Sequence, residues 1–278
     1  MPFLSTTHHD LYYVTQGDST QPPLLLLHGF LGNHQDFIPL VATLSRHFYC
    51  ITVDLPGHGK TRSHPNGYTF PATAQSLLAL LNHLNIRQTH LLGYSMGGRI
   101  ALYLACEFPD CFLRVVLESA SPGLRTAEAR KSRRESDSAI AHCLQTTSMS
   151  SFLTQWYHNP LFASLKNHPE VFSEMLQRRE NNNSIELSHA LKGLGTGEQP
   201  SLWEPLTQVR QPLLLIVGAL DAKFIAINGA MKALLEENKM SASRTVKLKT
   251  IKTCGHNIHL EAPAAYALTV LSFFDDII

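Results

Sequence analysis

Residues 93–97, Gly-Tyr-Ser-Met-Gly, place Ser95 between two glycines in the pattern GxSxG. The pattern follows an apolar run at residues 90–92 and precedes a helix-like stretch at residues 98–102. A tight strand-to-helix turn needs small residues on either side, and it exposes its serine at a sheet edge and a helix N-terminus. A chance match is the alternative for the pattern alone. The flanking strand and helix favour a nucleophilic or basic role for Ser95.

A serine hydroxyl is a poor nucleophile and base at neutral pH unless a histidine takes its proton and an acid orients that histidine. In folds that carry a GxSxG turn, the three residues occur along the chain in the order serine, acid, histidine. Asp221 and His256 each follow an apolar run and satisfy that order, whereas Asp54 precedes the serine. His259 is a second histidine nearby, and it fits equally well as a packed or solvated side chain. The sequence therefore predicts a triad of Ser95, Asp221 and His256.

Two backbone N–H groups are expected to bind a developing oxyanion. The turn His28-Gly29-Phe30 follows the first apolar run and predicts one donor at Phe30, and the second would be Met96, just after the serine. The turn at residues 54–59, DLPGHG, is interpreted as structural, because its glycines permit a tight bend.

The sequence predicts neither a metal nor a nucleotide cofactor. Asp54 and His58 have no third ligand at a convincing spacing, and with 15 histidines in the chain such pairs arise by coincidence. No GxGxxG follows an apolar run, and no GxxxxGK[ST] is present.

Composition indicates an ordinary globular protein. The 278 residues suffice for one large α/β domain with an insertion, and 44% are apolar and 16% charged. A net charge of +1 provides no global field toward nucleic acid or an anionic membrane. Five cysteines without CxxC spacing, a start lacking a signal-peptide pattern and the absence of an apolar run near ~18 residues predict reduced thiols and a cytoplasmic location. The sequence makes no prediction of oligomeric state.

The elements that must position these residues are short apolar runs that alternate with helical segments. The runs cover residues 24–27, 50–53, 90–92, 113–117, 213–217 and 246–251. This alternation predicts an α/β fold with a mostly parallel sheet covered by helices on both faces. Ligands of such sheets bind beyond the carboxyl ends of the strands, where the unusual residues lie.

The strand pattern stops between about residues 124 and 205. This stretch is polar, rich in arginine and helical in character, with breaks at Pro160, Pro169 and the GLGTG of residues 193–197. We therefore expect a core at residues 1–123, a helical cap at residues 124–205, and a second core segment at residues 206–278.

The order HGF, DLPGHG, GYSMGG, GALD and CGH resembles the α/β-hydrolase superfamily, whose members carry out many reactions. The sequence of the expected cap narrows the choice among these reactions. The stretches ESASPGLRTAEARKSRRESD, WYHNPLFASL, RRENNNS and LKGLGTGEQPSLWEPL, together with GYSMGGR and DAKF, are similar to the 2-succinyl-6-hydroxy-2,4-cyclohexadiene-1-carboxylate synthases of menaquinone and phylloquinone biosynthesis. The resemblance runs from about Leu24 to Pro263.

That resemblance implies the α/β-hydrolase fold and a lyase. The family removes pyruvate from 2-succinyl-5-enolpyruvyl-6-hydroxy-3-cyclohexene-1-carboxylate by abstracting a ring proton next to the succinyl ketone. It implies a triad of Ser95, Asp221 and His256. Carried over by position, the substrate contacts would be Tyr94, Arg99, Arg133, Trp156 and Arg179. Arg130 and Arg134 compete with Arg133 for its place, because they lie close by in the sequence.

These residue types suit a small tricarboxylate, because an arginine fork grips a carboxylate through two charge-assisted hydrogen bonds. Arg99 lies one helical turn beyond Ser95, toward the mouth of the site. Each residue also has an ordinary interpretation. Arg99 fits a surface salt bridge, Trp156 fits packing of the cap on the core, and most of the arginines near Arg133 fit a solvated helix face.

Two other functions use the same residues. A serine hydrolase of a small carboxyester or of a carbon–carbon bond needs the same serine, base and oxyanion donors. A non-catalytic receptor for a small acid would keep the pocket without turnover. The intact set of Ser95, Asp221 and His256 favours an enzyme.

Overall fold

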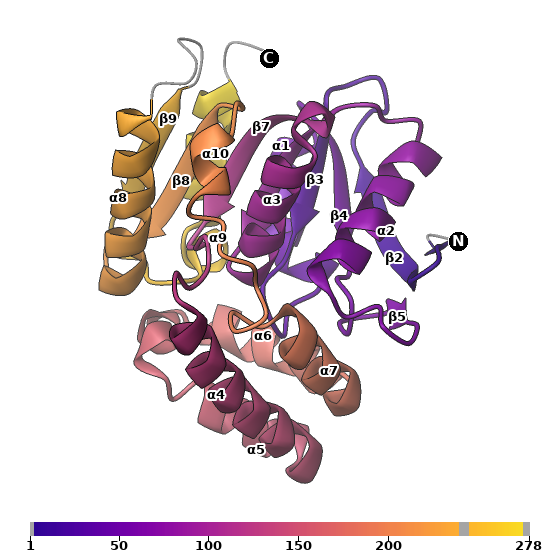
Figure 1. Cartoon of the computed structure of the whole chain (residues 1–278), viewed down its shortest axis with the longest axis vertical. Helices are drawn as coiled ribbons and strands as arrows, with labels where there is room; N and C mark the ends of the chain where they lie inside the picture. Colours follow the sequence, from indigo (N-terminus) through magenta and orange to yellow (C-terminus); the bar gives the residue numbers. More distant parts are fainter. Residues whose placement is uncertain (1–2, 239–244, 275–278) are drawn as a thin grey trace.

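The computed structural model describes residues 3–238 and 245–274 of the chain. These residues form a mostly parallel, nine-stranded sheet with helices packed around it (Figure 1). Its strands are β1 (Phe3–Ser5), β2 (His9–Gln16), β3 (Pro23–Leu27), β4 (Tyr49–Val53), β5 (Arg62–Ser63), β6 (Thr89–Tyr94), β7 (Phe112–Glu118), β8 (Leu213–Gly218) and β9 (Val246–Ile251). The order is β1-β2-β4-β3-β6-β7-β8-β9, with β5 beside β2. Every pair from β4 to β9 along this order is parallel, and β2 pairs antiparallel with β1, β4 and β5.

The helices form two groups: those that cover the sheet, and those that lie between β7 and β8 in the chain. The first group is α1 (Ile38–Leu44), α2 (Phe70–His83), α3 (Met96–Glu107), α8 (Ala222–Glu237), α9 (Ile258–Glu261) and α10 (Pro263–Phe274). The second is α4 (Ala127–Thr146), α5 (Met149–Trp156), α6 (Pro169–Glu180) and α7 (Ser184–Leu194). Short 3-10 turns are η1 (His34–Phe37), η2 (Pro109–Cys111), η3 (Pro160–Asn167) and η4 (Pro205–Gln208).

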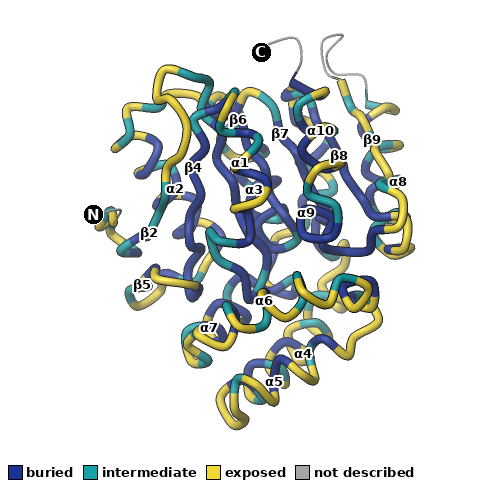
Figure 2. Tube along the Cα trace, turned by 180° about the vertical axis from the view of Figure 1, so that it is seen from behind, coloured by how far each residue is buried: buried dark blue, intermediate teal, exposed yellow. Residues whose placement is uncertain are grey.

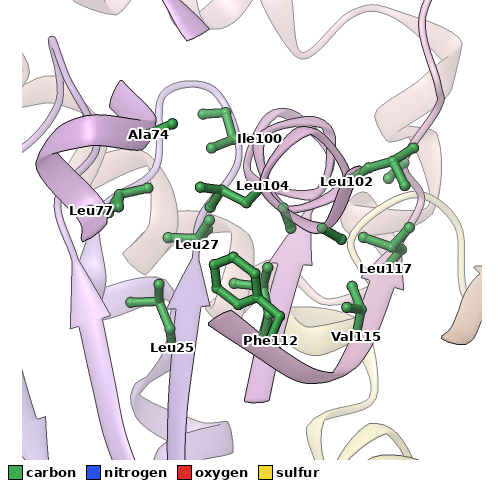
Figure 3. Packing of buried hydrophobic residues seen from close by; sticks show 14 of the residues in the cluster. Leu25, Leu27, Ala74, Leu77, Ile100, Leu102, Leu104, Phe112, Val115 and Leu117 are labelled. Carbon is green, nitrogen blue, oxygen red and sulfur yellow. The ribbon is translucent and has the colours of Figure 1, made fainter. Parts of the chain in front are cut away.

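Both faces of the sheet are buried along the central strands β3, β4, β6, β7 and β8, which explains why these strands read as nearly continuous apolar runs. Successive side chains of β3 point to opposite faces, so that Leu25 and Leu27 pack toward α2 and α3, and Leu24 and Leu26 pack toward α1 and α10. Figure 3 shows Leu27 close to Leu104 of α3. Each fully buried leucine contributes about 1.5–3 kcal/mol relative to an exposed one. The predicted fold, with its mostly parallel sheet and helices on both faces, is confirmed.

Helices α4 to α7 and η3, here called the cap, lie together beyond one end of the sheet (Figures 1 and 2). They share an apolar cluster that includes Leu144, Phe152 and Met175. The predicted breaks coincide with element starts and ends, because Pro160 begins η3, Pro169 begins α6 and α7 ends within the glycine-rich stretch. The division into segments at residues 123 and 206 stays a prediction.

All five cysteines lie in the described part of the chain and are free thiols. Among the described helices, none combines the length and the apolar character that crossing a bilayer requires.

Candidate active site

Ser95 lies on a sharp turn between β6 and α3, with φ 50° and ψ −107°. A non-glycine residue at positive φ costs of order 1–3 kcal/mol, and the surroundings hold it there. Its N–H donates to the carbonyl of Glu118 at 2.9 Å. A side chain at position 97 would meet the carbonyl oxygen of Leu27 at 2.1 Å, so the glycine after the serine lets α3 approach β3. The turn therefore aims the Ser95 hydroxyl beyond the sheet edge.

Ser95, His256 and Asp221 form one hydrogen-bonded chain. Nδ1 of His256 lies 2.7 Å from Oδ2 of Asp221, and Nε2 lies 3.1 Å from Oγ of Ser95. When Nδ1–H donates to the carboxylate, Nε2 is free to accept the serine proton. Asp221 is fixed in turn as the N-cap of α8, where Oδ1 accepts the N–H of Phe224 at 3.2 Å. The structure thus brings together three residues from distant parts of the chain in the geometry of a base-activated serine.

The triad opens into a cavity of about 720 Å³ between the sheet and the cap. Its described lining includes Ser95 and His256 from the core, and Trp156, Phe162 and Leu191 from the cap. The volume is within the range of small-molecule sites, and the apolar walls shield charges within it from water.

Arg99 lines this cavity from the first turns of α3. Its side chain makes a long hydrogen bond, 3.5 Å from Nη1 to the amide oxygen of Gln199. Burial, followed by the nearby charge of Arg133, lowers the pKa of Arg99 to about 9. A guanidinium destabilised by burial and by a like charge would be stabilised by a ligand carboxylate.

Arg133 also lines the cavity, and neither Arg130 nor Arg134 is among its lining residues in the described part of the chain. Nε of Arg133 donates to Oδ1 of Asp137 at 2.7 Å, one turn along α4. Arg130 instead donates to the carbonyl of Leu124, and Arg134 donates to the carbonyl of Gly197, each at 3.0 Å.

Arg179 reaches the cavity from α6 and is 2% exposed. Its Nη2 lies 3.3 Å from Oδ2 of Asp36, whose other oxygen accepts from Arg178 at 3.5 Å. Burial by itself would raise the pKa of Asp36, but Arg179 and other positive neighbours outweigh it and lower that pKa. Asp36 thereby holds two cap arginines to the core, and sequence reasoning missed it.

Tyr94 and Trp156 complete the set of residues expected at the substrate, and both line the cavity. Burial, followed by the charge of Glu118, raises the pKa of Tyr94 well above its ordinary value, so the hydroxyl stays protonated and can donate. Trp156 packs on Phe30 with ring centroids 5.4 Å apart, which fits packing of the cap on the core as well as contact with a ligand.

Comparison with known proteins assigns a family to this arrangement. A family profile described as the alpha/beta hydrolase fold matches residues 22–263. The putative 2-succinyl-6-hydroxy-2,4-cyclohexadiene-1-carboxylate synthase of Bacillus subtilis (strain 168) is 34% identical over 267 residues, covering 94% of this chain and 93% of that protein. This chain belongs to the 2-succinyl-6-hydroxy-2,4-cyclohexadiene-1-carboxylate synthase family.

A solved structure and a plant protein are also similar to this chain. The structure of MenH from S. aureus matches with a TM-score of 0.87 and 30% identity, covering 98% of this chain and 99% of that one. Protein PHYLLO, chloroplastic, of Arabidopsis thaliana is 33% identical over 257 residues, and this chain spans 15% of its length. The family resemblance expected from the motifs is confirmed.

In this member of the synthase family, the two residues whose backbone N–H groups are expected to bind an oxyanion lie at the cavity. Phe30 and Met96 both line it. Met96 is the first residue of α3, where an N–H has no carbonyl partner within the helix. Their role as oxyanion donors stays a prediction.

Asp54, the alternative acid, and His58, the other candidate metal ligand, are both held in the 54–59 turn. The Asp54 carboxylate accepts the N–H and Nδ1–H of His34 and the N–H of Lys60, at 2.7–2.8 Å. Nδ1 of His58 donates to the Pro56 carbonyl at 2.9 Å, and burial lowers the pKa of His58 to about 3. Gly57 and Gly59 have φ values of 78° and 55°, as a tight bend requires. The turn is structural in the synthase, as the glycines indicated.

His259, the other competitor, is bonded to a different residue, whereas His256 is the histidine bonded to Oγ of Ser95. His259 is fully buried and bonded to Glu118 through Nδ1 at 2.9 Å. Sequence reasoning left Glu118 without a role, and it also missed Asp137 and Glu261. Each of these carboxylates binds a residue of the synthase site or of the loop that carries His256.

Proposed function

We propose that this chain is a carbon–oxygen lyase that eliminates pyruvate from 2-succinyl-5-enolpyruvyl-6-hydroxy-3-cyclohexene-1-carboxylate. The product is 2-succinyl-6-hydroxy-2,4-cyclohexadiene-1-carboxylate. The observation that carries the proposal is a Ser-His-Asp chain that opens into a cavity lined by Arg99, Arg133 and Arg179, in a family whose relatives are named for this synthase. A tricarboxylate needs several cations, and these three arginines supply them locally in a chain of net charge +1.

The reaction begins with proton transfer. His256, oriented by Asp221, accepts the proton of Ser95, and the serine oxygen removes the ring proton next to the succinyl carbonyl. The electron pair of the broken C–H bond delocalises onto that carbonyl oxygen. The N–H groups of Phe30 and Met96 stabilise the resulting enolate.

Collapse of the enolate shifts the ring double bond and breaks the bond between the ring carbon and the enolpyruvyl oxygen. The departing enolate of pyruvate takes a proton at its methylene carbon and becomes pyruvate, and the ring keeps two conjugated double bonds. No step calls for water, a metal or a cofactor.

The predicted substrate contacts divide by chemistry. Arg99, Arg133 and Arg179 bind the carboxylates as charged forks, Tyr94 donates its protonated hydroxyl, and Trp156 covers the ring. The substrate is therefore held across the seam between the core and the cap. The cytoplasm stays the predicted location of this reaction.

A direct comparison of two activities tests the proposal. The purified chain receives the authentic cyclohexene substrate, with pyruvate followed through a coupled dehydrogenase, and in parallel a series of p-nitrophenyl esters. Catalytic release of pyruvate with weak ester turnover is expected. Efficient ester hydrolysis without pyruvate would replace the lyase by a serine hydrolase, and substrate binding without either reaction would leave a receptor.

A further inference from the structure

Two fully buried titratable side chains behind the triad take no part in the proposed reaction. Glu118 ends β7, and His259 lies in α9, shortly after His256 in the chain. Glu118 is 0% and His259 1% exposed, although an acid and an imidazole are costly to remove from water. A buried pair of this kind is weak support for stability by itself, because desolvation offsets the attraction.

The side chain of Glu118 holds the loop that carries His256. Its Oε1 accepts the backbone N–H of His259 at 3.1 Å, and Nδ1 of His259 lies 2.9 Å from both carboxylate oxygens. These residues are 141 positions apart in the sequence, so the bonds join separate parts of the fold.

The main chain of Glu118 holds the nucleophile turn. Its carbonyl accepts the Ser95 N–H at 2.9 Å. A single residue thus binds the turn that carries the serine and the loop that carries the base. The ring of Tyr94 fills the space between, with its centroid 4.6 Å from that of His259 and 5.5 Å from that of His256.

The loop around His256 is itself stiffened by a second buried carboxylate. Oε2 of Glu261 accepts the Gly255 N–H at 2.9 Å, and Oε1 accepts the Asn257 N–H at 3.2 Å. These bonds flank His256 on both sides. A loop clamped in this way transmits a displacement of residue 259 to His256.

We propose that Glu118 and His259 form a positioning pair that sets the distance between Oγ of Ser95 and Nε2 of His256. The inference rests on the triad of the proposed function. Neither residue touches the substrate, and the pair acts through the turn and the loop that it joins. Catalysis is sensitive to such placement, since a shift of about 1 Å in a reacting group costs on the order of 10²-fold. The effect belongs in kcat, because Arg99, Arg133 and Arg179 remain in place to bind substrate.

The test compares two substitutions of the histidine in the full-length chain. His259→Leu removes the Nδ1–H donor, and His259→Asn offers an amide N–H at nearly the same place. We expect His259→Leu to lower kcat for pyruvate release about 10- to 100-fold with KM within about threefold, and His259→Asn to recover most of that loss. Equal kcat in His259→Leu and wild type would overturn the proposal, as would equal losses in both variants.

A double variant separates positioning from stability. Glu118→Gln with His259→Leu removes the bond between the two side chains, keeps an acceptor for the residue 259 N–H and leaves no buried charge unpaired, so its melting temperature should return toward that of wild type. We expect kcat to stay low despite that recovery. Return of kcat together with the melting temperature would show that the pair only stabilises the fold.

His90→Asn is the matched control. His90 is also a buried histidine, and it packs on Phe48 and Phe274, remote from the site described above. Its loss should lower stability and leave kcat unchanged. Labelling of Ser95 by a fluorophosphonate is measured beside pyruvate release. A wild-type chain that labels but releases no pyruvate contradicts the lyase, whereas slower labelling of His259→Leu would still support the positioning pair.

Discussion

Arg99 and Arg133 place two like charges at one cavity, and their repulsion contributes to the lowered pKa of Arg99. Asp137 compensates the charge of Arg133 through Nε, which leaves the terminal nitrogens of that guanidinium for a ligand. Arg99 has a weaker partner, the amide of Gln199. At the scale of single residues, the site is therefore charged in a way that a polycarboxylate would relieve.

Adjacent arginines of α4 provide a matched pair for this idea. We expect Arg133→Ala to lower kcat/KM for the cyclohexene substrate about 10- to 100-fold, because a charge-assisted hydrogen bond is worth about 1.5–3 kcal/mol. Arg134→Ala should change kcat/KM less than about twofold, because Arg134 is bound to Gly197 and Glu198 and is not among the described residues that line the cavity. Steady-state kinetics of both variants check this. A larger loss of kcat/KM in Arg134→Ala than in Arg133→Ala would show that Arg133 is not the cap residue that binds the substrate.

The residues that the sequence could predict are those with a local signature. Ser95 lies in a five-residue pattern, and Asp221 and His256 follow apolar strands. Asp36 and Glu118 have no such signature, because their partners Arg179 and His259 lie 143 and 141 positions away. Contacts of that range arise only from the folded topology.

At the scale of elements, the close approach of α3 to β3 positions the serine. Gly97 faces the backbone of Leu27, and a Cβ there would lie 2.1 Å from a carbonyl oxygen that is fixed in the sheet. Gly229, in the middle of α8, meets nothing within 4 Å. Position 97 therefore has no room for a side chain, whereas position 229 has open space for one.

We expect Gly97→Ala to lower the free energy of unfolding by at least about 1–3 kcal/mol, because the sheet backbone cannot yield to the new methyl group. Gly229→Ala should raise it by about 0.5–1 kcal/mol, because alanine loses less backbone entropy in a helix. Urea unfolding of both variants tests the pair. A Gly97→Ala protein as stable as wild type would refute the close-packed turn.

The elements themselves were predictable where both faces are buried. Five of the six predicted runs became the largely buried parallel strands β3, β4, β6, β7 and β8. The sixth became β9, an edge strand that is partly exposed and alternates apolar with polar residues over much of its length. The antiparallel strands β1, β2 and β5 were not predicted, because they lie toward one edge of the sheet, are partly exposed and carry polar residues such as His9 and Asp10. Edge strands lack the continuous apolar signal of a doubly covered sheet.

At the scale of the whole molecule, several buried histidine side chains are neutral in the folded state. Burial lowers the pKa of His9 to about 4 and that of His58 to about 3, and burial followed by Arg114 lowers the pKa of His90 to about 4. In the unfolded chain the same groups bind a proton near pH 6.5. Between these limits the unfolded state binds more protons, so stability falls as the pH falls.

The predicted slope is about 1.4 kcal/mol per pH unit for each such histidine, below about pH 6.5. Urea unfolding at about pH 7 and about pH 5 measures it. His90→Leu removes one proton-binding group from the unfolded chain and should flatten the slope by one histidine's share. An unchanged slope in that variant would contradict a neutral, buried His90.

The chain as a whole brings a serine, a histidine and an acid from distant segments to one cavity, and the central claim is that Ser95 is the base of a lyase. Turnover of the authentic cyclohexene substrate by Ser95→Ala tests this most directly. We expect pyruvate release to fall about 10²–10⁴-fold, with the fold and substrate binding retained. Release within a few-fold of the wild-type rate would contradict the account.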